Sequence, residues 1–352
     1  MQIPIDIKAI VNEATDVDQA RNTPISVCVY LDTTAPADLQ AFVRQAFAAT
    51  SPHARVMLAP FPEFAPSASH GADIAVIVAG FDERISEYAA AVRAAGVPAM
   101  VLTTMPHIVS EQAAKSTFPL LECDLLSPSI PRSSKALAER AGTFAEPQDL
   151  SEENVSSLIR KMGEWIIATC PEKKLAFAMA FPFVRRTLSL EAVKATALQN
   201  AGVGLVLFIP GADMPVMTLN QAKMLLQIAA AYGQPMSAER AKELAVVVGG
   251  GFVFRSVARQ VMSFVPALGW AVKAGIGYSG TFAMGKAAIE YFEGGGNIRG
   301  LGEVVNKARE KVVQAAAAAS DQPKLNAAVK NVRDHAGAAG EIIVGRLKKD
   351  RD

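Results

Sequence analysis

The sequence has few of the residues that build metal sites or disulfide frameworks. It contains three cysteines (Cys28, Cys123 and Cys170) and four histidines in 352 residues, and they are scattered along the chain. Structural zinc sites require closely spaced cysteine and histidine pairs, and disulfide-rich secreted domains need a denser cysteine pattern. We therefore expect no metal, no disulfide and no cofactor, and three reduced thiols in a cytoplasmic protein.

The chain also lacks an excess of charge of either sign. Lysine and arginine total 35 residues against 34 aspartates and glutamates, which gives a net charge of +1. Binding to nucleic acid or to acidic substrates usually depends on a strong positive field, so we expect no nucleic-acid partner. Asp6 and Lys8 lie where a secretory signal would need an apolar core, so we do not expect secretion.

A long uninterrupted apolar run is missing as well. The longest uncharged run, 195–212, contains Thr196, Gln199, Asn200 and Pro210. Four basic residues interrupt the later apolar region: Arg255, Arg259, Lys273 and Lys286. A central arginine or lysine in a membrane span costs about 2.5–3.5 kcal/mol. We therefore expect a cytoplasmic location, with peripheral or integral association at the inner face of the cell membrane as the alternatives.

The first third of the chain alternates strand-like and helix-like patterns. β-branched apolar runs predict strands at 25–32, 55–61, 72–80, 97–103 and 120–126. Amphipathic spacing predicts helices over 36–47 and 82–95. This alternation predicts a mostly parallel sheet that is covered by helices on both faces.

From about residue 150 onward the pattern is helical. Two apolar hairpins turn at 208–213 and 264–269, and the capping-box sequence Thr218–Gln221 predicts that a helix begins at Thr218. We predict α/β plus all-α architecture, a mostly parallel sheet domain followed by an α-helical hairpin bundle. The predicted parts are an N-terminal arm (1–22), the α/β domain (23–126), a linker (127–150), the helical bundle (151–300) and a polar helical tail (301–352).

Three sequence motifs that nucleotide hydrolysis requires are absent. The segment after the first strand, Asp32–Asp38, has neither the glycines nor the lysine of a P-loop, and its two carboxylates would repel phosphate. The third and fourth strands are followed by 78–82 and 103–106, without the Asp-x-x-Gly and Asn-Lys-x-Asp motifs of a GTPase. We therefore predict no catalytic residues, and only Thr33 and Thr34 remain as weak candidates for an atypical phosphate site.

Residues 280–287 (GTFAMGKA) nearly match a P-loop motif. However, no strand precedes them, and they lie inside a helical pattern that runs from 268 to 292. The spacing of Gly277, Thr281 and Gly285 by four residues instead predicts a small-residue face for close helix packing.

A few charged and aromatic residues in apolar surroundings are candidates for interaction with a partner. They are Arg185, Arg186, Asp213, Arg255, Arg259 and Trp270. The simple alternative is that the arginines extend to solvent or pair with Asp213, Glu239 or Glu243, and that Trp270 anchors packing. The functional alternative is contact with lipid phosphates or with a partner's carboxylates.

Residues 171–293 resemble the helical domain of unknown function that follows Era-type GTPase domains in many bacterial proteins and also occurs in inner-membrane proteins encoded beside GTPases. The motifs that carry the resemblance are 181–186 (FPFVRR), 194–200 (KATALQN), 208–213 (FIPGAD), 218–224 (TLNQAKM), 249–251 with Arg255, 269–270 and 280–293. Residues 24–126 resemble a degenerate Era-type GTPase domain, P-loop-GTPase-like in its order of elements. The resemblance implies a membrane-associated or GTPase-partner module, and it implies no catalytic residues.

Together these features predict a non-catalytic interaction protein, in which a pseudo-GTPase domain is joined to a helical bundle. The bundle would dock on a membrane surface or on a protein partner, either a GTPase or a second copy of the chain. Two alternatives remain: a GTP-binding protein with an atypical site, and a carrier that holds a lipid or small molecule between the apolar hairpins.

Overall fold

The computed structural model of the chain contains two compact units. It describes residues 7–61, 71–118, 120–128, 146–206, 213–239, 269–298, 300–305 and 307–308. The α/β unit comprises Asp16–Leu188 and Ala230–Gly233. The helical unit comprises Met1–Thr15, Ser189–Ala229 and Gln234–Asp352. The predicted combination of an α/β part with a helical part is confirmed.

The α/β unit is built on a five-stranded sheet in which every pair of neighbouring strands is parallel. The strands are β1 (Ile25–Asp32), β2 (Ala54–Phe61), β3 (Ile74–Val78), β4 (Ala99–Leu102) and β5 (Leu125–Leu126). Their order is β2-β1-β3-β4-β5, which is the order of flavodoxin-like doubly wound sheets. The predicted parallel sheet is therefore confirmed, although its fifth strand is much shorter than the predicted 120–126.

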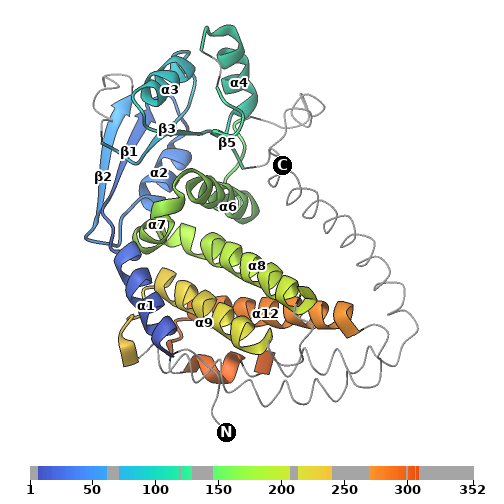
Figure 1. Ribbon diagram of the computed structural model, residues 1–352. Coiled ribbons are helices and arrows are strands. Elements are labelled where there is room, and N and C mark those ends of the chain that lie inside the picture. The colour runs from blue at the N-terminus through green and yellow to red at the C-terminus, as the bar shows by residue number, and fades with distance from the viewer. Residues whose placement is uncertain are drawn as a thin grey trace, which may run out of the picture. The chain divides into compact units, whose positions relative to one another are not determined.

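Helices cover both faces of this sheet (Figure 1). α2 (Ala37–Ala46) and α6 (Glu152–Thr169) pack on the face that carries Val27, Val29 and Leu31 of β1. α3 (Ile85–Ala94) and α4 (Pro106–Lys115) pack on the opposite face, which carries Cys28 and Tyr30. Because neighbouring residues of β1 are buried on opposite sides, the strand is apolar at consecutive positions from Val27 to Leu31 rather than at alternate positions.

The sequence did not predict α4. Only a narrow stripe of this helix is buried, at Pro106, Val109 and Ala113, so its hydrophobic periodicity is weak. Pro106 stands in the first turn, where its fixed φ suits a helix and its missing N–H costs nothing.

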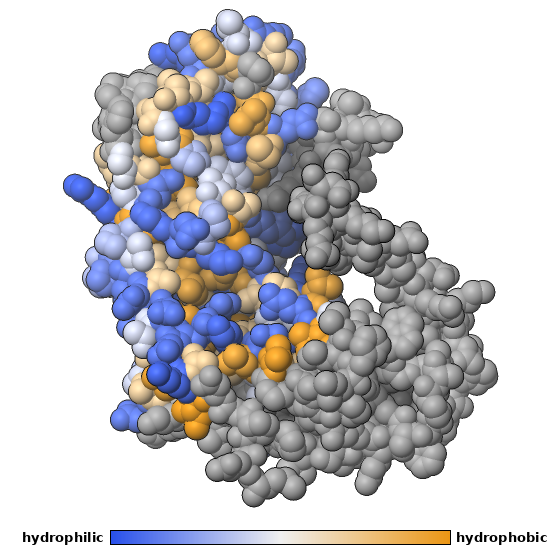
Figure 2. All heavy atoms as spheres, viewed as in Figure 1, coloured by the Kyte–Doolittle hydropathy of each residue, from blue (hydrophilic) through white to orange (hydrophobic). Residues whose placement is uncertain are grey.

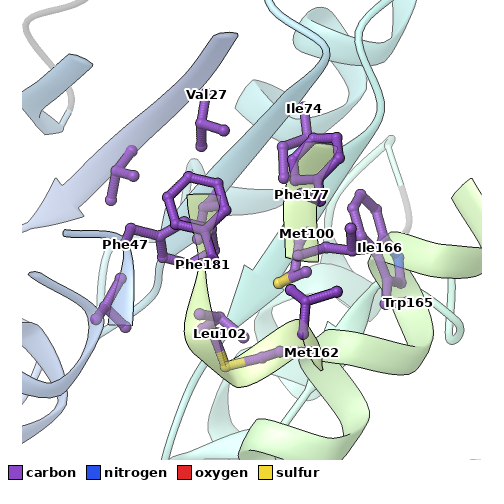
Figure 3. Packing of buried hydrophobic residues seen from close by; sticks show 14 of the residues in the cluster. Val27, Phe47, Ile74, Met100, Leu102, Met162, Trp165, Ile166, Phe177 and Phe181 are labelled. Carbon is purple, nitrogen blue, oxygen red and sulfur yellow. The ribbon is translucent and has the colours of Figure 1, made fainter. Parts of the chain in front are cut away.

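The core of the α/β unit extends well beyond residue 150. Trp165 and Ile166 of α6 pack with Met100 of the sheet, and Phe177 and Phe181 continue the same cluster (Figure 3). Phe177 belongs to α7 (Lys174–Ala180), which follows a 3-10 turn at Pro171–Lys173. The predicted boundary at 150/151 therefore does not coincide with the division at Leu188, because these helices contribute their apolar residues to the core of the sheet.

Among the described residues, four longer helices lie wholly or partly in the helical unit. They are α1 (Ile7–Arg21), α8 (Pro182–Val206), α9 (Asp213–Ala231) and α12 (Gly269–Glu293), and the ends of the first three belong to the α/β unit. Lys223 of α9 forms an ion pair with Glu13 of α1, with 2.7 Å between Nζ and Oε2. Within the described residues, no helix has the combination of length and hydropathy that a membrane span requires.

The predicted helix start at Thr218 is wrong. α9 begins at Asp213, and Thr218 is a buried residue inside the helix, only 6% exposed. A Thr-x-x-Gln pattern marks a helix start only where the preceding residues are not helical, which the pattern itself does not reveal. The corner residues 208–212 and 264–268, and most of the predicted tail, lie outside the described part.

The sequence that resembles a P-loop lies in the interior of α12, as predicted. A Cβ atom at Gly285 would meet both methyl groups of Val193 on α8, with Cγ1 at 2.9 Å. A Cβ atom at Gly280 would have no neighbouring atom within 4 Å. Close helix packing is therefore observed at Gly285 and not at Gly280.

This difference predicts opposite effects of the same substitution in one helix. Gly285→Ala should lower the free energy of unfolding by about 1–3 kcal/mol, because the added methyl group overpacks the contact with Val193. Gly280→Ala should raise it by about 0.5–1 kcal/mol, because alanine favours helix and meets no obstacle. Urea unfolding of the full chain measures both values. Equal effects at the two positions would contradict the packing assignment.

Candidate functional site

Ligands of doubly wound sheets bind outside the carboxyl ends of the strands, at the point where the strand order reverses. In this sheet that point lies between β1 and β3, because β1 is flanked by β2 on one side and β3 on the other. Asp32 ends β1 and is followed by Thr33 and Thr34, and the loop after β3 carries Gly80, Phe81 and Asp82. These two loops form the candidate site.

The carboxylate of Asp32 occupies the centre of this site. Its side chain is 1% exposed. Oδ1 accepts hydrogen bonds from the amide and hydroxyl of Thr34, both at 2.8 Å. Oδ2 accepts hydrogen bonds from the amides of Gly80 at 2.7 Å and Asp82 at 3.3 Å. The backbone donors that could face a phosphate group are thus bound to the protein's own carboxylate.

The two loops are also in direct contact. A Cβ atom at Gly80 would collide with the backbone of Thr34 and Ala35 and with the hydroxyl oxygen of Thr34. That hydroxyl oxygen in turn accepts a hydrogen bond of 2.6 Å from the amide of Phe81. Both candidates for a phosphate site, Thr33 and Thr34, are exposed residues, but Thr34 uses both of its donors within the protein.

A second carboxylate occupies the N-terminus of α4. Glu146 accepts hydrogen bonds from the amides of His107 at 2.7 Å and Ile108 at 3.2 Å. The exposed amides and the dipole at a helix N-terminus favour a negative group at this place. Here the chain supplies that group itself.

Side chains beside β5 form a third set of internal contacts. Lys161 of α6 is 6% exposed, and its ammonium group donates to the carbonyl oxygens of Ser127 at 2.6 Å and Pro128 at 3.1 Å. One turn later, Trp165 Nε1 donates to Asp124 Oδ1 at 2.9 Å. Asp124 also pairs with Arg93, at 3.2 Å. The buried charges near the end of β5 are therefore matched by protein groups, as a stable interior requires.

The structure assigns a local packing role to Arg185, one of the predicted interaction residues. Its guanidinium group donates to the carbonyl oxygens of Ala178 at 3.1 Å and Met179 at 3.5 Å, at the C-terminus of α7. Thr50 completes this end by donating its amide to the carbonyl oxygen of Ala180 at 2.9 Å. Burial lowers the pKa of Arg185, and the helix C-terminus favours the positive charge.

The other interaction candidates are spread along the chain. Arg186 is an exposed residue of α8. Asp213 is the first residue of α9 and Trp270 the second residue of α12, but their side chains lie outside the described part. Arg255 and Arg259 also lie outside the described residues. The candidates whose side chains are described, Arg185 and Arg186, do not meet in one site: Arg185 contacts the end of α7, and Arg186 is exposed on α8.

Sequence reasoning missed a buried polar network in the helical unit. Thr281 of α12 accepts hydrogen bonds from Asn200 of α8 and Gln221 of α9, both at 3.0 Å. Asn220 donates to Asn200 Oδ1, also at 3.0 Å. Thr281 and Asn200 are 0% exposed. The network thus links three helices inside an apolar bundle, where such contacts favour one helix register over others.

A signal for this network was present in the sequence. Its residues come from three of the segments that carry the family resemblance, namely 194–200, 218–224 and 280–293. Amides and hydroxyls do not titrate near neutral pH, so this arrangement suits helix packing and hydrogen-bond recognition rather than acid–base catalysis.

The acidic residues and thiols do not form a metal or nucleophile site in the described ranges. No group of three His, Cys, Asp or Glu residues there could hold a metal ion. Burial raises the pKa of Cys170 to about 11 and also raises the pKa of Cys28. Since the thiolate is the reactive form, these two cysteines are poor nucleophiles at neutral pH.

No protein-family model, curated protein or solved structure matches the chain. The resemblance to the helical domain that accompanies Era-type GTPases therefore stays a prediction from the sequence motifs.

Proposed function

We propose that the protein acts by binding another macromolecule and that its α/β unit does not hydrolyse nucleotides. The supporting observation is the Asp32 carboxylate, which takes the amides of Thr34, Gly80 and Asp82 at the switch point of the sheet. A nucleotide would have to displace this carboxylate and then bind against its negative charge. Hydrogen bonds to charged groups contribute about 1.5–3 kcal/mol each, so such a displacement is unfavourable.

The proposal predicts that the intact protein does not respond to nucleotides. Thermal unfolding should shift by less than about 1 °C with GTP, GDP or ATP at 1 mM in the presence of Mg²⁺, because no site is available to bind them. A true site filled to 100 times its Kd would add about 2.7 kcal/mol to the free energy of unfolding and raise the Tm by several degrees. Inorganic phosphate at the same concentration is the control for general anion effects.

Two results would contradict this proposal. One is a Tm increase of several degrees that requires both the nucleotide and Mg²⁺ and is absent with phosphate. The other is release of phosphate from GTP at a rate above that of a Gly80→Ala variant, whose added methyl group distorts the same loops. Either result would favour an atypical GTPase over an interaction protein.

The choice among partners rests on other features. A GTPase partner and a membrane surface follow from the family resemblance, and both stay predictions. Hydrophilic side chains cover most of the described surface of the α/β unit on the face shown in Figure 2, where hydrophobic atoms occur in small groups. A partner of this unit therefore needs specific polar contacts in addition to apolar ones.

A further inference from the structure

The strand β2 lies at one edge of the sheet, and among the described residues its one neighbouring strand is β1 (Figure 1). The carbonyl oxygen of His53, just before β2, accepts a hydrogen bond from the amide of Ile25. Because backbone groups along a strand alternate in direction, the odd-numbered residues of β2 face β1 and the even-numbered residues face outward. The outward residues are Ala54, Val56, Leu58 and Pro60.

The outward groups define a short region that can accept another strand. Pro60 has no N–H, and the amide of Ala54 already donates to Ser51. The amide and carbonyl groups of Val56 and Leu58 remain, and within the described residues they have no hydrogen-bond partner. The free edge therefore offers two donors and two acceptors over 56–58, flanked by a residue that ends further pairing.

The side chains along this edge differ between its two faces. Leu58 is 44% exposed, and it projects on the same face as Val56, which packs against the apolar core on that side of the sheet. Arg55 projects on the opposite face and is exposed, and no acidic residue occurs between 52 and 61. Within the described residues Arg55 forms no ion pair. The edge thus has an apolar side and a positive side.

We propose that the free edge of β2 binds an extended segment of a partner protein, which adds a sixth strand to the sheet. The segment carries two apolar residues at alternate positions, which contact Val56 and Leu58, and an adjacent acidic residue, which pairs with Arg55. In this mode of recognition, backbone hydrogen bonds supply affinity and alternate side chains supply specificity. This proposal rests on the proposed function, binding of another macromolecule, and specifies the kind of segment that is bound.

The charges on β2 argue against a second copy of the chain as the occupant of this edge. The β2 strand of a second copy would place another Arg55 at the edge and has no carboxylate that could pair with Arg55 of the first copy. Stable dimers usually bury about 1,200–2,000 Å² in total, far more than a ladder over three residues supplies. A separate extended segment needs only the ladder, the apolar contacts with Val56 and Leu58, and one ion pair.

The test uses two fluorescent peptides with blocked ends and the full-length protein. One peptide contains the sequence Glu-Val-Thr-Val-Glu, which is suitable for either strand direction, and the other contains Lys-Val-Thr-Val-Lys. Fluorescence polarisation at low salt should give the acidic peptide a Kd on the order of 100 µM and the basic peptide a weaker one.

Three variants separate the contributions. Leu58→Pro removes one outward N–H while the ladder to β1, which uses the odd-numbered residues, stays intact; we expect at least about tenfold weaker binding. Leu58→Thr keeps the N–H and should bind only a few-fold more weakly. Arg55→Glu should reverse the preference, so that the basic peptide binds better than the acidic one. Urea unfolding of each variant verifies that the fold is retained.

Several outcomes would overturn the proposal. The first is that neither peptide binds at 1 mM. The second is that Leu58→Pro binds the acidic peptide as tightly as the unmodified protein does. The third is that Arg55→Glu still prefers the acidic peptide to the basic one. A dimer in sedimentation experiments that Leu58→Pro dissociates would assign the edge to a second copy instead. Nucleotide titrations are run as a separate experiment. If the protein binds both GTP and the acidic peptide, the proposal that it does not use nucleotides fails, while the proposal for the free edge of β2 stands.

Discussion

Replacement of Asp32 by alanine should lower the free energy of unfolding by about 3–4 kcal/mol. The substitution leaves the buried amide of Gly80 and the amides of Thr34 and Asp82 without their acceptor. An unpaired buried donor costs about 1–3 kcal/mol, and water can reach only part of this group of amides. The loss should appear in urea unfolding as a lower midpoint with an unchanged slope.

Two further variants show whether the carboxylate itself is responsible. Asp32→Asn keeps the shape but presents an NH2 group to backbone donors, so it should lose about 1–2 kcal/mol. Asp38→Ala, in the exposed first turn of α2, removes one hydrogen bond to the adjacent amide of Leu39 and should lose only about 0.5 kcal/mol. If Asp32→Ala were as mild as Asp38→Ala, Asp32 would not be the group that closes the site.

Replacement of Phe181 by alanine should lower the free energy of unfolding by about 3–5 kcal/mol, the range for a fully buried phenylalanine. Phe181 is 0% exposed, and its ring lies 5.2 Å from that of Phe47, just after α2, and 6.1 Å from that of Phe177 (Figure 3). The substitution would leave a cavity between α2 and the helices that follow residue 150. Urea unfolding of the full chain measures the loss.

The same variant tests where the α/β unit ends. If α7 and the start of α8 complete its core, Phe181→Ala should also speed amide hydrogen exchange in β1 and β3, because their protection depends on global stability of the unit. Phe118→Ala is the matched control, since that ring is 48% exposed and its loss should cost less than about 0.5 kcal/mol. Unchanged exchange in β1 would place Phe181 outside this core and restore the predicted boundary.

Some features of the candidate site could be predicted from the sequence, and others could not. The missing glycines and lysine after β1 predict that this loop does not cradle a phosphate group as a P-loop does, and this stays a prediction. The partner of Asp32 was not predictable, because Gly80 lies 48 residues away along the chain. Likewise Asn200 and Thr281, 81 residues apart, form a pair that no local pattern indicates.

The sequence by itself determined the secondary structure of most segments, since apolar periodicity and β-branched runs act over a few residues. It identified the strands β1, β2, β3 and β4 and the long helix α12. Only the tertiary structure decided that α6 and α7 pack against the sheet, that α9 begins before Thr218, and that the strand β2 has a free edge among the described residues. The physical reason is that an apolar stripe or a polar donor requires some partner, and only the folded chain determines which partner that is.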